Sequence, residues 1–153
     1  MTCFLCSWSA AEINYPFVYE TAHWRVVLAP NQSLLGRCVV QLKRHVGGLA
    51  EGTPDELLEW LEVVQKLERA LKIAFGATMF NWSCYMNHAY HEKLYNPHLH
   101  WWVVPRFDAP VTLAGRMFSD PHFGSPYDHH RWEDVSSELR AEIVTRLQRA
   151  LLL

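Results

Sequence analysis

Residues 96–106 read NPHLHWWVVPR, an aromatic and β-branched run that predicts a β-strand. Side chains alternate between the two faces of a strand, so His98, His100 and Trp102 share one face. Burying two imidazoles on one face of a strand costs free energy unless the ring nitrogens have hydrogen-bond partners or bind a ligand. The pattern alone leaves two interpretations open: a pair of hydrogen-bonded histidines at a sheet edge, or a functional site.

The same stretch resembles the signature of the histidine triad (HIT) superfamily, His-x-His-x-His-x-x-Pro with apolar residues at x. His98, His100 and Pro105 match this signature, and Trp102 stands where the third histidine is expected. Three other stretches also look like the family: residues 19–20 before an apolar strand, residues 36–46 ending in LKRHV, and residues 53–57 at the start of a long helix. The resemblance covers residues 3 to about 107.

The resemblance implies an activity on nucleotides. In the family, the middle histidine attacks the α-phosphorus and forms a covalent nucleotidyl-imidazole, which water or another acceptor then resolves; by position this residue is His100. The implied substrates are dinucleoside polyphosphates, nucleoside phosphoramidates and other mononucleotide conjugates, cleaved by a hydrolase or a nucleotidyltransferase. Covalent catalysis suits imidazole, which is neutral near pH 7. The candidate substrate-binding residues are Asn31 and Gln32 (ribose or base), Asn81, Asn87 (α-phosphate), Trp102 (hydrogen bond, stacking or pocket closure) and Arg106 (phosphate entrance).

A second group of residues has the composition of a metal site. Cys3 and Cys6 form a Cys-x-x-Cys pair, whose spacing lets two thiolates bind one tetrahedral ion. Several HIT proteins hold zinc with two N-terminal cysteines, a histidine after the Lys-x-His-type strand and the first histidine of the signature, and here His45 and His98 fill the last two positions. Four protein ligands leave no open coordination position, so the predicted zinc is structural.

Composition sets the broad class. The chain has 153 residues, of which 50% are hydrophobic and 20% charged, which predicts one globular domain. The formal net charge of −2 argues against an extended nucleic-acid surface, which is usually basic, and no apolar run is long enough to cross a membrane. The first residues lack the features of a signal peptide, so we expect a cytoplasmic protein with reduced thiols, in which Cys38 and Cys84 are buried in strands.

The predicted fold is α+β: a HIT-like antiparallel sheet with a long helix packed on it, an irregular tail and a C-terminal helix. The long helix runs from Pro54 to Phe75, with a capping box at Thr53 and a C-terminal glycine, and its apolar stripe includes Leu57 and Leu61. Strands are expected at 18–20, 24–28, 38–42, 78–86 and 99–104, and a helix at 137–151. Residues 1–107 form the HIT-like core; residues 108–153 complete the same domain and begin with a long surface loop at 108–131.

Two functions from other classes stay open at this point. Trp102 offers one N–H donor and no acceptor, so the protein could bind nucleotides with little or no catalysis. It could also be a zinc-stabilised domain used for protein contacts. The family resemblance further implies a homodimer, formed through the long helix and an edge strand.

Overall fold

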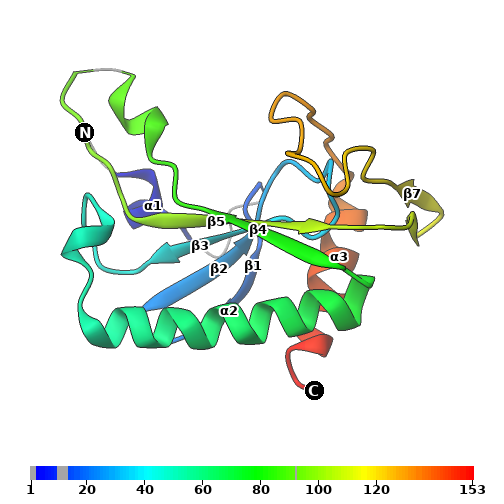
Figure 1. Ribbon diagram of the computed structural model, residues 1–153. Coiled ribbons are helices and arrows are strands. Elements are labelled where there is room, and N and C mark those ends of the chain that lie inside the picture. The colour runs from blue at the N-terminus through cyan, green and yellow to red at the C-terminus, as the bar shows by residue number, and fades with distance from the viewer. Residues whose placement is uncertain (1–2, 10–13, 92) are drawn as a thin grey trace.

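The computed structural model describes residues 3–9, 14–91 and 93–153 and contains a five-stranded antiparallel sheet with strand order β1-β2-β3-β5-β4. The long helix α2 covers one face of this sheet (Figure 1). The opposite face carries α1 and the β4–β5 connection at one end and the tail after β5 at the other (Figure 1). The predicted α+β architecture is therefore confirmed.

The elements follow the predicted order with small shifts at their ends. They are α1 (Phe4–Ser7), β1 (Phe17–Glu20), β2 (Trp24–Leu28), β3 (Cys38–Leu42), η1 (Leu49–Glu51), α2 (Pro54–Phe75), β4 (Met79–Ser83), η2 (Asn87–Tyr90), β5 (His100–Arg106), β6 (Val111–Leu113), β7 (Arg116–Phe118) and α3 (Ser137–Ala150).

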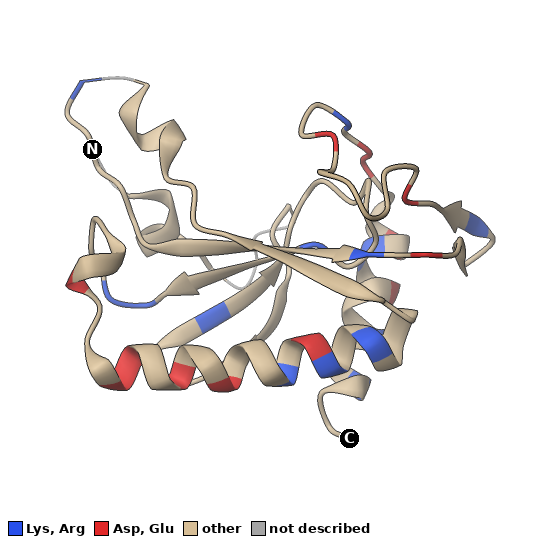
Figure 2. Cartoon of the chain, in the orientation of Figure 1, with Lys and Arg blue, Asp and Glu red and all other residues tan. Residues whose placement is uncertain are grey.

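Local sequence determines both ends of α2. The Thr53 hydroxyl accepts from the Glu56 backbone N–H, and the Glu56 carboxylate accepts from the Thr53 backbone N–H, which completes the predicted capping box. Gly76 ends the helix in the left-handed conformation at φ 73°. Figure 2 shows the ribbon of α2 coloured for acidic residues along its first half and for basic residues, with one acidic residue among them, in its second half, an order that suits the helix dipole.

Glu56 also binds Arg44, and this pair gives a pH-dependent prediction. Arg44 donates to both carboxylate oxygens at 2.8 and 2.9 Å and, with Thr53, lowers the Glu56 pKa to about 2. Glu56→Gln should lower the free energy of unfolding by about 2 kcal/mol at pH 7. Because the folded-state pKa is depressed, this contribution is complete above pH 4.5 and is lost as the pH falls toward 2. In urea denaturation, the difference in free energy of unfolding between the wild type and Glu56→Gln should become smaller below pH 4.5. An equal difference at pH 3 and pH 7 would contradict this prediction.

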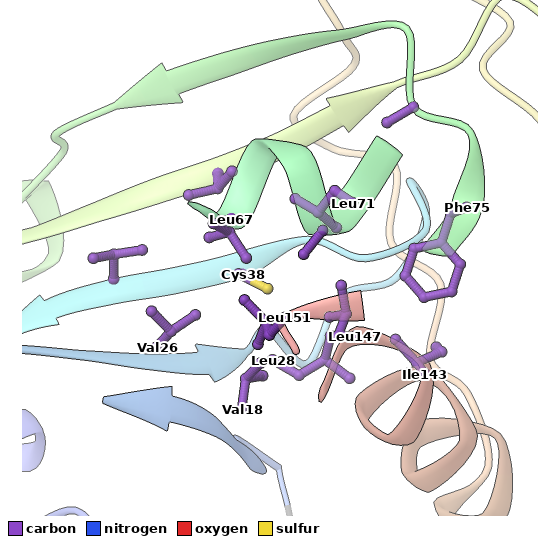
Figure 3. Close-up of a cluster of buried hydrophobic side chains, with 14 of the residues drawn as sticks. Val18, Val26, Leu28, Cys38, Leu67, Leu71, Phe75, Ile143, Leu147 and Leu151 are labelled. Atoms are coloured by element: carbon purple, nitrogen blue, oxygen red, sulfur yellow. The ribbon is translucent and has the colours of Figure 1, made fainter. Parts of the chain in front are cut away.

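The main hydrophobic core lies between the sheet and the two long helices. Figure 3 shows Leu67, Leu71 and Phe75 of α2 facing side chains of α3 and of the sheet, with the Cys38 sulfur among them. Burial raises the pKa of the Cys38 thiol to about 12, and Cys84 is half-buried against the same core, so both behave as packed thiols.

The buried face of α2 differs from the predicted stripe at its first turns. Val63, Leu67 and Leu71 are buried, but Leu57 and Leu61 are 37% and 47% exposed. The reason is the start of the helix, where the buried side chain is Glu56, bonded to Arg44 and Thr53. The face that contacts the sheet is therefore rotated away from Leu57 and Leu61.

The tail is more ordered than the loop expected at residues 108–131. Strands β6 and β7 form a hairpin whose turn residues, Ala114 and Gly115, both have positive φ (49° and 78°). Leu113 and Phe118 are buried in the main core, which the lack of periodicity in this stretch did not reveal. Side chains of α3 join the same core.

Candidate active site and metal centre

Strand β5 carries the decisive residues onto the sheet face opposite α2. It pairs with β3 on one side, with Gln41 opposite His100 and Val39 opposite Trp102, and with β4 on the other, with Ser83 opposite Trp102. Because facing residues of paired strands project to the same side, His100 and Trp102 share this face with Val39 and Ser83. Trp101 and Val103 project to the other side and join the core over α2.

The imidazole of His100 is held in one orientation by its own strand. Its Nδ1 lies 2.8 Å from the His98 carbonyl oxygen, which can only accept, so Nδ1 carries the proton. Within the described residues Nε2 has no hydrogen bond and therefore keeps its lone pair. Burial lowers the pKa of His100 below its usual 6.5, and the nearby charge of His88 lowers it further, so the ring is neutral at pH 7. This is the protonation state that a nitrogen nucleophile needs.

A cavity of about 630 Å³ opens beside His100, within the range typical of small-molecule sites. His100, Trp102 and Val39 of the sheet form one wall, and Phe4, Leu5 and Tyr15 of the N-terminal segment form an apolar second wall. The β4–β5 connection supplies the remaining wall, with His88, His91 and Lys93 as its basic groups. An apolar wall faces a neutral imidazole and basic groups, which suits a ligand with an aromatic part and an anionic part.

Residues of the N-terminal segment and the sheet are tied together at this cavity. Gln41, opposite His100 on β3, donates through Nε2 to the Leu5 carbonyl at 3.3 Å. The Trp8 indole donates to the Tyr15 carbonyl at 3.0 Å, and the Arg25 guanidinium lies 4.5 Å from the centre of the Trp8 ring. The wall made by the N-terminal segment is therefore held against the sheet by directed contacts.

The structure brings Cys3, Cys6, His45 and His98 together, with one potential ligand atom of each within 4.8 Å of all the others. The His98 Nδ1 lies 3.2 Å from the Cys3 sulfur, 3.4 Å from the Cys6 sulfur and 3.2 Å from the His45 Nδ1, and the His45 Nδ1 lies 3.2 Å from the Cys6 sulfur. Donor atoms about 2.0–2.3 Å from a zinc ion stand roughly 3.3–3.8 Å apart in a tetrahedron. The spacing of this set is therefore compatible with zinc.

The protonation of His98 agrees with a metal site. Its Nε2 lies 2.6 Å from the Leu42 carbonyl oxygen, so the proton is on Nε2, and the Nδ1 lone pair points toward the two sulfurs and His45. Metal-bound histidines usually donate their other N–H to a carbonyl in this way. Burial and the neighbouring Cys3 raise the pKa of the Cys6 thiol, and a cation bound at this point would favour its deprotonated, metal-binding form.

Arg106 and Asn81 lie at the other end of the same sheet face, at a second cavity of about 420 Å³. Arg106 is only 1% exposed and binds Asp120 through Nε and Nη2, at 2.6 and 3.1 Å. Its remaining donors bond to the Asn81 amide oxygen and to two carbonyl oxygens of the tail. The structure therefore uses Arg106 to anchor the tail and does not bring it to the cavity beside His100.

Asn31 and Gln32 are not brought to either cavity. The Asn31 amide donates to the Arg131 carbonyl and accepts from the Ser33 and Glu133 backbone N–H groups. Gln32 is fully buried; its amide donates to two carbonyls of its own loop and accepts from the Gly36 N–H. These bonds occupy the groups predicted to meet the ribose or base, so both side chains hold the loop before β3 and the tail.

The β4–β5 connection contributes a residue that the sequence did not single out. Asn87 begins η2 and is exposed, outside the cavity lining, whereas the next residue, His88, lines the cavity and acts electrostatically on His100. The one-residue difference arises from the short 3₁₀ turn, whose orientation no sequence signal in this segment predicts. The sequence also did not single out Gln41, because its position beside the cavity depends on its pairing with His100 of β5.

Comparisons with known proteins agree with this geometry. The family model of the HIT domain matches residues 10–109. A hypothetical histidine triad nucleotide-binding protein from Sulfolobus tokodaii strain 7 is similar at a TM-score of 0.74 and 19% identity, covering 98% of this chain and 92% of that chain. A Zn-bound histidine triad family protein from Mycobacterium smegmatis gives 0.59 and 22%, covering 89% and 83%. A histidine triad protein from Marinobacter aquaeolei gives 0.69 and 16%, covering 91% and 90%.

At these identities the likeness to solved structures shows the fold. The comparison with curated proteins gave no match.

Proposed function

The chain belongs to the HIT domain family, and from this premise we propose that it cleaves nucleotides at an α-phosphate, as a hydrolase or nucleotidyltransferase, with His100 as the nucleophile. One observation carries the proposal: the bond from His100 Nδ1 to its own strand leaves the Nε2 lone pair free beside the larger cavity. Dinucleoside polyphosphates and nucleoside phosphoramidates are the substrate classes.

In the proposed first step, His100 Nε2 forms a bond to the α-phosphorus while the bond from phosphorus to the leaving group breaks. The leaving group departs with that electron pair and takes a proton from solvent. The imidazole becomes a nucleotidyl-imidazolium, which the His98 carbonyl stabilises through the bond from Nδ1. In the second step, water adds to phosphorus and gives up a proton to solvent, the P–N bond breaks with its electron pair returning to Nε2, and a nucleoside monophosphate leaves with His100 neutral again.

Trp102 is the residue on which the choice between catalysis and nucleotide binding alone depends. Its ring centre lies 6.1 Å from that of His100, in an edge-on arrangement, so it forms the wall at the point where a third histidine would stand. Indole can donate one hydrogen bond and stack on a ring, but it cannot carry a proton to a leaving group. We therefore propose that turnover favours leaving groups that depart without protonation by the enzyme. Because Trp102 cannot supply a proton, the alternative function is nucleotide binding with little or no catalysis.

We also propose that Cys3, Cys6, His45 and His98 hold one structural zinc ion. The support is the spacing of the four donor atoms and the hydrogen bond from the His98 Nε2 to the Leu42 carbonyl, which orients the ring. Four protein donors fill a tetrahedron, so the ion supplies stability and orientation and takes no part in the reaction. His98 links the two sites, because its side chain belongs to the metal set and its carbonyl oxygen orients His100.

The proposed ligand is a small phosphorylated molecule, and the proposed protein partner is a second copy of the chain. We propose a homodimer that covers the exposed leucines Leu57, Leu58 and Leu61 of α2 and the edge strand β4, and a location in the cytoplasm. Among the described residues, no helix combines the length and apolar character that crossing a bilayer requires. The formal charge of −2 supports a small phosphorylated ligand over a nucleic-acid polymer.

A diadenosine polyphosphate and a fluorogenic adenosine phosphoramidate test the proposed function, and we expect faster turnover of the polyphosphate. We expect multiple turnovers and, in rapidly quenched samples, a fraction of the protein heavier by one adenylyl group, as measured by intact-protein mass spectrometry. AMP should also raise the melting temperature. Melting-temperature shifts without turnover or adduct would favour the binding protein, and no response to any nucleotide would contradict both.

A further inference from the structure

One buried cation on the catalytic face has no acidic partner. Arg37, just before β3, is 9% exposed; its Nε is buried without a hydrogen-bond partner, and within the described residues its side chain makes no ion pair. Its contacts are with two aromatic rings: its Cζ lies 5.8 Å from the centre of the Trp102 ring and 5.7 Å from that of Tyr127. Arg37 itself lines neither cavity, but Trp102 lines the first cavity and Tyr127 the second. A buried charge without a counterion is unfavourable, so it indicates an anion that the free protein lacks.

The contrast with Arg106 makes this assignment specific. Both arginines are buried and lie near the Tyr127 ring, but Arg106 is neutralised by Asp120 and bonded to tail carbonyls. Arg37 has no such neutralisation, and burial lowers its pKa. An incoming anion would therefore find its countercharge in Arg37.

Two other polar groups lie on β4, on the same face of the sheet. The Ser83 hydroxyl, on the strand paired with β5 at Trp102, is buried and has no hydrogen-bond partner within the described residues. Asn81 uses its amide oxygen to accept from Arg106, so its amide N–H₂ group remains as a donor. Ser83, Asn81 and Tyr127 all line the second cavity, and Tyr85 lines both cavities, so the two are neighbours on one face.

We propose that Arg37, with Ser83 and Asn81, forms a subsite for a phosphoryl group beyond the α-phosphate. Trp102 lies between this subsite and His100, in ring contact with both. A nucleotide with its α-phosphate at His100 would pass Trp102 and extend its next phosphate toward Arg37. The inference rests on the proposed function and narrows it: the preferred substrates carry a di- or polyphosphate, and the leaving group departs as a phosphate anion with the electron pair of the broken P–O bond.

Such a subsite would compensate for the absence of a third histidine, whose position in the signature is occupied by Trp102. A phosphate leaving group needs no proton from the enzyme, and a guanidinium stabilises the negative charge that develops on it. An amine leaving group, as in a phosphoramidate, needs a proton and has no use for Arg37. The structure therefore favours dinucleoside polyphosphates over phosphoramidates.

The experiment compares AMP with α,β-methylene-ADP, whose P–C–P bridge resists cleavage, by isothermal titration calorimetry at one ionic strength. The wild-type protein should bind the diphosphate analogue about 10- to 100-fold more tightly than AMP, the range expected for bonds to a charged donor. Arg37→Met should bind both equally, and Arg37→Lys should keep part of the preference. Lys72→Met is the matched control, because Lys72 also lies over an aromatic ring, that of Phe80, but belongs to α2 on the other side of the sheet, and it should keep the full preference.

Folding of the variants can be checked independently. Arg37→Met removes an unpaired buried charge, so its melting temperature without ligand should equal or exceed that of the wild type. Ser83→Ala should fold normally and lose a smaller part of the preference. A large fall in melting temperature in Arg37→Met, with the preference intact in Arg37→Lys and Ser83→Ala, would make Arg37 a packing residue and overturn the subsite.

Inorganic pyrophosphate separates the two proposals. If AMP binds and the methylene analogue binds no more tightly, the subsite is overturned and the proposed function stands. If neither nucleotide binds but pyrophosphate binds the wild type and not Arg37→Met, the subsite stands and the nucleotide function fails.

Discussion

Replacing His100 with alanine should abolish the nucleotidyl intermediate and lower kcat/KM by about 10³-fold or more. A nucleophile cannot be bypassed without a different reaction path, and losses of this size or larger follow removal of a catalytic nucleophile. The residual rate would come from binding and from the remaining groups of the cavity. Radiolabelled nucleotide, quenched rapidly and retained on denatured protein, measures the intermediate directly, and the phosphoramidate assay measures turnover.

The control for this prediction is His130→Ala, which removes an exposed tail histidine outside both cavities. It should leave the intermediate and the rate unchanged. His100→Ala should also keep its zinc content, since His100 is not a member of the metal set. If the His100→Ala protein became covalently labelled to the wild-type level, another residue would be the nucleophile and the proposed mechanism would be refuted.

Removing the metal should destabilise the protein and also inactivate it. We expect about one zinc ion per chain in the purified protein, and we expect Cys3→Ser or Cys6→Ser to lose it. Structural zinc contributes directly to folding, so a loss of at least about 3 kcal/mol is expected, or a fall in melting temperature of roughly 6–12 °C for a chain of this size. Activity should fall in parallel although His100 is intact, because the carbonyl of His98 orients it. Metal mass spectrometry and calorimetry measure the two effects.

Cys84→Ser provides the matched comparison, since it removes a half-buried thiol that lies outside the four-residue set. It should keep the zinc and most of the stability. Zinc added back to chelator-treated wild type should restore both the melting temperature and the rate. A wild-type protein without metal, whose melting temperature a chelator leaves unchanged, would refute the zinc assignment.

Much of the fold could be predicted from local patterns. The capping box at Thr53 and Glu56 and the glycine after Phe75 define α2 without reference to any other element. The period of two in β5 places His100 and Trp102 on one face in any sheet that accepts the strand, whereas His98 lies just before the strand begins. The hairpin turn at Ala114 and Gly115 escaped prediction because Ala114 adopts positive φ, a conformation that its residue type does not signal.

The candidate site was predicted less completely, because polar side chains acquire their roles from partners that are distant in the chain. Asn31 and Arg106 look like ligand-binding residues in isolation, but one bonds to Arg131 and Glu133 and the other to Asp120. These partners lie in the tail, whose path across the sheet has no sequence signature. Once those bonds form, the donors are no longer free for a ligand.

The sequence by itself determined which residues of β5 share one face of the sheet, where the long helix begins and ends, and which four residues have the chemistry to bind zinc. Each of these follows from a short period, a cap or a residue type, and depends little on the rest of the chain. Only the tertiary structure decided which nitrogen of His100 is free, which arginine is neutralised and which one keeps an unmatched charge. Those properties depend on contacts between elements, since a donor is free or occupied only once its neighbours are in place.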